Sequence, residues 1–359
     1  MFSKRIILIF LVIIIIVIGL LLIFKNSVSI EKFTLDEIPT LPRPFVNLYN
    51  DKHEKVNVIL VSHPFTRRTG TNGTYEQYEY WNNNKGLNFI GITSYSEFPS
   101  VYSNPYDGLS NPKDQSWDHD YMKYFRLWLN CFRDPDKYIK DTTTKKLLLS
   151  ESDFINEEQF KLTEDIPKKY DFLYICLEDD KNKECKKGWN YYIRNWELAK
   201  KCISIMCNKY NLKGIIIGRT NCELPDGCDH LVTMENKLPQ QKLIDIYKQT
   251  KFLLLPNMAD ASPRTLAEAL GCNMRCLVNY NILGGWKYVN EQTGEFFTDE
   301  HDFEQSLKKL LENYDNYSPS KYYWDNYGKE KSGILLRDFL LENVNNLNFT
   351  KESTKYITI

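Results

Sequence analysis

The stretch PNMADASPRTLAEALGCN, residues 256–273, carries the pattern on which the fold assignment depends. Ser262 is typical of a helix N-cap, because its hydroxyl can accept hydrogen bonds from early backbone amides, and Pro263 suits the first helical position. Apolar side chains then share one side of the predicted helix, with Arg264 and Glu268 on the other. Taken alone, the segment is either a surface helix with an Arg–Glu pair or a ligand site at a helix start.

The segment belongs to a series of short apolar strands and amphipathic helices that starts near residue 168. The expected strands are 170–177, 213–220, 251–257 and 274–280, and the expected helices are 189–210, 239–250 and 263–271. This alternation predicts an α/β domain with a parallel sheet covered by helices on both faces. Ligands of such sheets bind beyond the carboxyl ends of the strands, where the polar segments 179–188, 218–220, 257–262 and 281–285 stand here.

The preceding part of the chain predicts a smaller α/β domain. Strands are expected at 56–65, 87–95 and 145–154, helices at 75–83 and 120–132, and a long loop at 99–115. No Gly-x-Gly-x-x-Gly follows any of the expected strands, which counts against a dinucleotide-binding dehydrogenase or epimerase.

Acidic and basic residues lie where ligands of the second sheet are expected. Asp260 and Glu268 stand on either side of the predicted helix start, whose free amides form an anion site. Lys187 and Gly188 follow the first strand of the same sheet and add a cation at the same edge. A cation, a positive helix end and acceptor carboxylates suit a diphosphate joined to a polyol, because carboxylates accept hydrogen bonds from sugar hydroxyls.

These residues resemble the retaining glycosyltransferases of family 4, which have the GT-B architecture of two facing Rossmann-like domains. The resemblance covers roughly residues 168–344. It rests on an ordered set: an acid, seven residues, a glutamate in an Ala-rich helix, a strand, a Gly-Gly loop and a Thr-Gly turn. In this sequence the set is Asp260, Glu268, Gly284-Gly285 and Thr293-Gly294.

The resemblance implies a binding site for a UDP- or GDP-linked sugar as co-substrate, with no metal and no other cofactor. It implies that Glu268 holds the ribose, that Asp260 lies near the transferred sugar, and that Lys187 lies near the diphosphate. It also implies that backbone amides around Ser262, Pro263, Arg264 and Thr265 complete a phosphate cradle.

The sequence departs from the family pattern in three places. Asp260 stands where glutamate is usual, and ICLEDD, residues 175–180, replaces a Gly-Arg pair after the first strand, so a second phosphate cation is missing. Arg219 and Arg264 are the candidates to replace it. The N-terminal half is also short for an acceptor domain. On that acceptor side His119 is the candidate catalytic histidine, with His63 as the alternative.

The N-terminal segment predicts a membrane anchor. Residues 6–24 carry no charge and would span about 29 Å as a helix, close to the hydrocarbon thickness of a bilayer. Lys4 and Arg5 precede this segment, which predicts a single-pass type II orientation. Residues 27–29, Ser-Val-Ser, leave a cleaved signal peptide open as an alternative.

The predicted organisation therefore has six parts. They are an N-terminal tail 1–5, an anchor 6–24, a proline-containing stem 25–54, an acceptor-side domain 55–160, a donor-binding domain 161–345 and a tail 346–359. The net charge of -1, without a clustered basic face, argues against a nucleic-acid partner. The nine cysteines form no regular framework, although Cys222 and Cys228 could pair in an oxidising compartment.

The sequence thus predicts a membrane-anchored, metal-independent, retaining glycosyltransferase. It would move a hexose-type sugar from a nucleotide sugar to a glycan, protein or lipid acceptor. One alternative is an inactive relative that binds glycans or serves as a scaffold, which the departures at Asp260 and at residues 175–180 favour. Another is a metal-dependent site at the Asp-x-Asp motifs 118–120 or 134–136.

Overall fold

The computed structural model describes residues 38–66, 73–100, 115–116, 119–162, 166–180, 182 and 185–359. The predicted tail 1–5, the anchor 6–24, residues 25–37 of the stem and most of the loop 99–115 lie outside these residues, so the predictions for them stand untested. Within the described ranges, none of the helices has the length and apolar character needed to cross a membrane. Residues 40–359 form one compact unit that contains two six-stranded sheets.

The second sheet is wholly parallel, as the alternation of strands and helices predicted. Its strand order is β10-β9-β8-β11-β12-β13. The strands are β8 (Tyr170–Ile175), β9 (Gly214–Ile217), β10 (Val232–Met234), β11 (Thr250–Leu255), β12 (Arg275–Asn279) and β13 (Gly294–Phe297). The central strand β11 pairs Leu253 with Leu173 of β8 and Leu254 with Leu277 of β12. A continuous run of apolar residues is what a strand buried on both faces requires.

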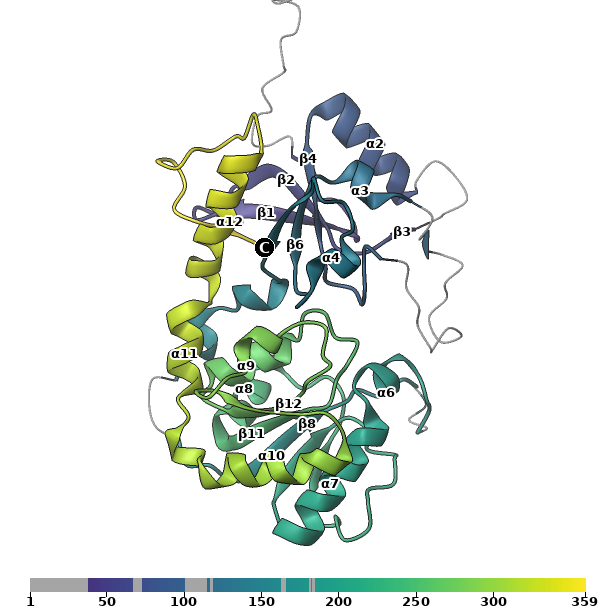
Figure 1. The fold of residues 1–359 in the computed structure, drawn as a ribbon, viewed down its shortest axis with the longest axis vertical. Helices are drawn as coiled ribbons and strands as arrows, with labels where there is room; N and C mark the ends of the chain where they lie inside the picture. The colour runs from purple at the N-terminus through teal and green to yellow at the C-terminus, as the bar shows by residue number, and fades with distance from the viewer. Residues whose placement is uncertain are drawn as a thin grey trace, which may run out of the picture. The chain divides into compact units, whose positions relative to one another are not determined.

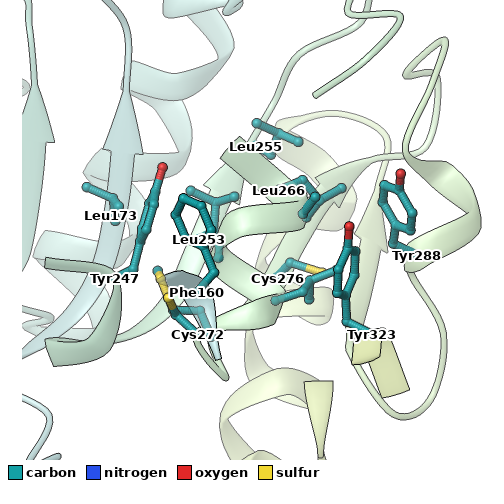
Figure 2. Close-up of a cluster of buried hydrophobic side chains, with 14 of the residues drawn as sticks. Phe160, Leu173, Tyr247, Leu253, Leu255, Leu266, Cys272, Cys276, Tyr288 and Tyr323 are labelled. Atoms are coloured by element: carbon teal, nitrogen blue, oxygen red, sulfur yellow. The ribbon is translucent and has the colours of Figure 1, made fainter. Parts of the chain in front are cut away.

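Helices cover both faces of this sheet (Figure 1). The helices of this half are α6 (Trp189–Ile193), α7 (Trp196–Tyr210), α8 (Gln240–Gln249), α9 (Arg264–Gly271), η4 (Trp286–Tyr288), α10 (Glu300–Glu312) and η5 (Tyr314–Asn316). Side chains alternate along a strand, so Leu254 packs with α7 and α10 while Leu253 packs with α8 and α9. Figure 2 shows the second of these cores, with the ring of Tyr247 between Leu173 and Phe160.

The first sheet is mixed. Its order is β14-β1-β2-β4-β6-β7, with β2, β4, β6 and β7 parallel and β1 antiparallel to both β2 and β14. The strands are β1 (Phe45–Asn50), β2 (Lys55–Val61), β4 (Asn88–Ile92), β6 (Leu127–Asn130), β7 (Lys145–Leu148) and β14 (Ile357–Thr358). A separate pair joins β3 (Phe65–Thr66) to β5 (Gln115–Ser116). The helices of this half are α2 (Thr74–Lys85), α3 (Tyr121–Tyr124), α4 (Pro135–Tyr138), η3 (Glu151–Phe154) and α5 (Glu157–Phe160).

Two predictions about this first half are wrong. Residues 120–132 are not one helix, because α3 ends at Tyr124 and β6 follows between β4 and β7 with all four residues buried. A short apolar run fits a buried strand as well as a helix, and here the sheet position decides. The stem prediction fails from residue 45, where Phe45 and Leu48 of β1 are buried against the sheet.

The C-terminal boundary also differs from the predicted one. After α11 (Pro319–Asn326) the chain continues into α12 (Lys329–Asn343) and β14. Leu336 and Leu340 of α12 pack in the core of the first sheet, and β14 pairs with β1. The last segment therefore belongs to the first sheet, neither to the donor-binding domain predicted to extend to residue 345 nor to a tail at 346–359.

Candidate functional site

The start of α9 does not use the predicted cap. Pro263 is the N-cap residue, and no side chain caps the helix. The Ser262 hydroxyl instead accepts a hydrogen bond from the backbone amide of Ser152, with 3.0 Å between Oγ and N. Its carbonyl accepts the amide of Arg264 at 2.8 Å. The N-cap prediction for Ser262 is therefore wrong, although Ser262, Pro263, Arg264 and Thr265 all lie at the helix start.

The side chain of Glu268 is largely buried, whereas that of its ion-pair partner Arg264 is exposed. The side chain of Glu268 is 12% exposed, whereas that of Arg264, four residues earlier, is 69% exposed. Its Oε2 accepts the Tyr247 hydroxyl of α8 at 3.0 Å, and its Oε1 lies 3.2 Å from Nε of Arg264. The interpretation of this helix as a solvated surface element with an exposed ion pair is therefore excluded for Glu268.

The environment of Glu268 disfavours its charge. Burial raises the pKa of Glu268, although Arg264 and the Tyr247 hydroxyl both favour the ionised carboxylate. A carboxylate held at such a position opposes stability, and groups of this kind gather at functional sites. Glu268 is thus a hydrogen-bond acceptor that the fold places beside the first turn of α9.

Asp260 is held on the loop between β11 and α9. Its Oδ2 accepts hydrogen bonds from Nη1 of Arg194 and, at 2.9 Å, from Nδ2 of Asn257. The Asp260 side chain is 11% exposed and the Arg194 side chain 31% exposed. The backbone carbonyl of Asp260 accepts the amide of Gly284 at 2.9 Å, which joins this loop to the Gly-Gly loop.

The Gly-Gly loop lies directly against the loop that carries Asp260. A Cβ at Gly284 would lie 1.9 Å from the carbonyl oxygen of Ala261, so no other residue fits there. Gly285 has a φ of 78°, and a Cβ there would lie 2.4 Å from Cγ of Pro263. The fold thus brings together Asp260, the start of α9 and the Gly-Gly loop.

Arg219 is a buried residue that holds the loop before α6 in place. Its side chain is fully buried and forms an ion pair with Asp179, and its Nη1 donates to the Lys186 carbonyl at 2.9 Å. The Asp179 carboxylate in turn accepts the first amides of α6, those of Asn190 at 2.6 Å and Tyr191 at 2.9 Å. The Arg219 guanidinium is therefore already buried and paired with Asp179, which argues against the expectation that it binds a phosphate.

Lys187 and Gly188 lie on the loop that Arg219 clamps. Gly188 is the N-cap of α6 and packs against Asp179. The side chain of Lys187 is 64% exposed, and its Nζ lies 4.0 Å from the Glu197 carboxylate. Its charge therefore remains accessible at the strand ends of the second sheet.

Two disulfides stabilise this half, and neither joins Cys222 to Cys228. Cys185 pairs with Cys222, and Cys207 pairs with Cys228. The first disulfide ties the Lys187 loop to the turn that follows Arg219. The Cys222–Cys228 pairing that the sequence left open is not formed, because each of the two cysteines pairs with a more distant segment.

The two candidate histidines occupy different surroundings. His119 stacks on Tyr75 with 4.5 Å between ring centroids, and its Nδ1 lies 3.1 Å from the Tyr124 hydroxyl. His63 lies two residues after the end of β2. Its ring centroid lies 5.7 Å from that of Tyr95, and the Tyr95 ring in turn stacks at 5.6 Å on Trp189 of α6.

His63 is therefore linked to α6 through the ring of Tyr95. The ring of His119 instead contacts the aromatic residues around β3. Burial and the nearby Arg43 lower the pKa of His63 to about 4, so this ring is neutral at physiological pH.

Metal-ligand clusters are absent from the described ranges. No three His, Cys, Asp or Glu side chains come together there as ligands would. Asp136 of the second Asp-x-Asp motif pairs with Lys146, and Asp118 of the first motif lies outside the described residues. The described side chains therefore offer no preformed metal site.

Sequence reasoning missed Arg194 and Tyr247, and it placed Asn257 in the polar segment 257–262 without giving it a role. Arg194 lies inside the segment expected as a single helix, Asn257 ends an expected strand, and Tyr247 reads as one more apolar residue of an amphipathic helix. The only available signal was their proximity to strand ends of the second sheet, which holds for Asn257 alone.

Solved structures share this fold at low sequence identity. A glycosyltransferase from Rickettsia africae matches with a TM-score of 0.53 at 12% identity, over 80% of this chain and 77% of that one. The chain has the GT-B fold. The pneumococcal O-GlcNAc transferase GtfA, solved with UDP and GlcNAc, matches with a TM-score of 0.53 at 10% identity, over 80% of this chain.

A sucrose-phosphate synthase from Thermosynechococcus elongatus matches with a TM-score of 0.52 at 9% identity, over 74% of this chain and 71% of that one. The chain spans 57% of GtfA and 52% of TarM, a further match with a TM-score of 0.52. No family model and no curated protein matches the chain. These similarities confirm the predicted GT-B architecture.

Proposed function

We propose that this protein is a glycosyltransferase that moves a hexose-type sugar from a UDP- or GDP-linked donor to a glycan, protein or lipid acceptor. The observation that carries the proposal is the enclosed Glu268 carboxylate at the start of α9, within a domain of GT-B fold. A carboxylate there suits the two ribose hydroxyls of a nucleotide, each of which can donate to one oxygen. The structural neighbour GtfA, which was solved with UDP, supports this class of donor.

The proposed transfer retains the configuration at the anomeric carbon. The bond between that carbon and the diphosphate breaks, and negative charge gathers on the departing β-phosphate. The exposed Lys187 ammonium is placed on the loop that begins α6, where it would stabilise this charge. The acceptor hydroxyl attacks the same face of the sugar, and its proton passes to the departing phosphate.

Residues 6–24 would anchor the enzyme in a membrane with type II orientation, which remains a proposal from the sequence. The transfer would need no metal, since Lys187 and the start of α9 carry the positive charge. Chelation tests this point: activity should persist in EDTA. Loss of activity in EDTA with recovery on adding Mn²⁺ would instead assign the chemistry to an Asp-x-Asp site.

An inactive sugar-binding protein is the second candidate. The pairing of Asp260 with Arg194 favours it, because this carboxylate is already engaged in the unliganded protein. Release of nucleoside diphosphate from a panel of UDP- and GDP-sugars separates the two functions. An enzyme releases diphosphate from at least one donor, and Glu268→Gln slows that release. Binding of a donor without any release would support the inactive protein.

A further inference from the structure

The helical segment after Lys187 is interrupted before α7, which the sequence does not predict. Residues 189–210 read as one amphipathic helix, yet α6 ends at Ile193 and α7 begins at Trp196. Asn195 takes the left-handed conformation, with φ of 51° and ψ of 57°. Asparagine tolerates this region better than most residues, which makes the break possible at this position.

The break is held by contacts to two strands. The Arg194 carbonyl accepts a hydrogen bond from the Tyr174 hydroxyl of β8 at 2.8 Å, and the side-chain Nδ2 of Asn195 donates to the Pro256 carbonyl after β11 at 3.2 Å. The first bond fixes the backbone at Arg194, and the second ties the neighbouring Asn195 side chain to the end of β11. As a result, the guanidinium reaches the loop before α9 and meets Asp260 there.

Asp260 is held at one oxygen only. Arg194 and Asn257 both donate to Oδ2, and no hydrogen bond from a described residue reaches Oδ1. An ionised carboxylate only accepts hydrogen bonds, so the Asn257 side chain must turn its nitrogen toward Asp260. Asn257 is fully buried, and its own Oδ1 has no partner among the described residues, so its orientation is set by Asp260.

This geometry has two consequences for the carboxylate. Two donors on one oxygen restrict rotation of a side chain that stands on an irregular loop. The Arg194 guanidinium also balances the charge of this carboxylate, whose side chain is 11% exposed. The free oxygen is therefore both oriented and charged.

We propose that Arg194 and Asn257 are positioning residues that hold Oδ2 of Asp260 so that Oδ1 accepts one hydroxyl of the donor sugar. The inference rests on the proposed glycosyl transfer and adds the part of the donor that the pair serves. Recognition is of a neutral ring hydroxyl, and the diphosphate is bound elsewhere, on the side of Lys187.

The test compares Arg194→Gln with wild type in the full chain, using the best donor and a series of analogues that each lack one ring hydroxyl. In wild type, one analogue should react at least tenfold more slowly than the parent donor. In Arg194→Gln the parent donor should lose a similar factor in kcat/KM, and the discrimination against that one analogue should shrink to less than threefold. Arg194→Lys should recover part of the loss, because it restores the charge without the planar fork.

Three controls separate positioning from other roles. Lys201→Gln removes a cation of α7 whose partner is Glu300, and it should leave every rate unchanged. Inhibition by free UDP or GDP should be the same in Arg194→Gln as in wild type, since the diphosphate is not the partner. Melting temperatures of all variants should be measured, and Arg194→Lys carries the comparison if Arg194→Gln unfolds.

The results that overturn the inference are distinct. Weaker inhibition by the free nucleotide in Arg194→Gln would make Arg194 a diphosphate ligand, and unchanged discrimination among the analogues would make it a structural residue. If wild type transfers sugar and both Arg194→Gln and Asn257→Ala react as fast as wild type, the inference is refuted and the proposed function stands. A wild-type protein that turns over no nucleotide sugar would refute the proposed function together with it.

Discussion

Replacing Glu268 by glutamine separates function from stability at the same position. The change removes a charged acceptor while keeping the shape of the side chain and its hydrogen bond with Tyr247. If Glu268 accepts ribose hydroxyls, a charge-assisted bond worth roughly 1.5–3 kcal/mol is weakened, which corresponds to about a 10- to 150-fold loss in kcat/KM. The loss should appear in the KM for the donor, because the ribose is bound before and during the reaction.

Folding stability should move the other way or stay constant. Burial raises the pKa of Glu268, so the folded protein holds its proton to a higher pH than the unfolded chain does. Ionisation of Glu268 therefore opposes folding as pH rises through the folded pKa, and glutamine removes this opposition at neutral pH. The variant also loses the pair with Arg264, which is 69% exposed and contributes only a few tenths of a kcal/mol, roughly.

The same shift predicts a pH effect on donor binding. The wild-type KM for the donor should rise on acidification from a higher pH than an ordinary glutamate would give, and Glu268→Gln should lack this rise. Glu312→Gln is the matched control, since Glu312 forms an exposed pair with Lys308 four residues earlier in α10. An active Glu268→Gln enzyme with the wild-type donor KM would refute the assignment of this site.

Three further predictions concern the loop before α6. Lys187→Ala should lower kcat more than Glu268→Gln lowers kcat/KM while leaving the melting temperature unchanged, because the side chain is 64% exposed; an unchanged turnover number would contradict the assignment. Arg219→Leu should destabilise the fold by about 3–5 kcal/mol in urea unfolding, because Asp179 would remain buried without its cation. Replacing Cys185 and Cys222 by serine should lower the unfolding free energy by about 2–4 kcal/mol, because the disulfide links residues 37 positions apart. The same replacement should raise the donor KM. If neither value changes, this disulfide does not support the loop.

The second sheet was predictable because its sequence is locally consistent. Its four predicted strands, β8, β9, β11 and β12, are apolar runs separated by polar loops and amphipathic helices, so period and length lead to the same assignment, whereas β10 and β13 were not predicted. The first sheet was less so. The segment Leu127–Asn130 has four buried residues in a row, and only its place between β4 and β7 makes it a strand. Likewise, α12 returns to the first sheet through Leu336 and Leu340, which no local pattern reveals.

Some features of the site could likewise be predicted from the sequence, and others could not. Asp260, Glu268 and the Gly-Gly loop could be placed at one edge because they follow neighbouring strands of one sheet. The enclosure of Glu268 could not be read from the sequence, since it depends on Tyr247 from another helix. The burial of Arg219 depends on Asp179, forty residues away, and so appears only in the folded chain.

Binding of a nucleotide sugar tests the central claim most directly. The full chain in detergent should be titrated with UDP- and GDP-sugars while its melting temperature is recorded, beside Glu268→Gln and Glu312→Gln. One donor class should stabilise wild type and Glu312→Gln, by about 2.7 kcal/mol when the free ligand is at 100 times its Kd, and should stabilise Glu268→Gln much less. If no nucleotide sugar changes the melting temperature of wild type, or if Glu268→Gln responds as wild type does, the donor site is not where Glu268 and Asp260 place it.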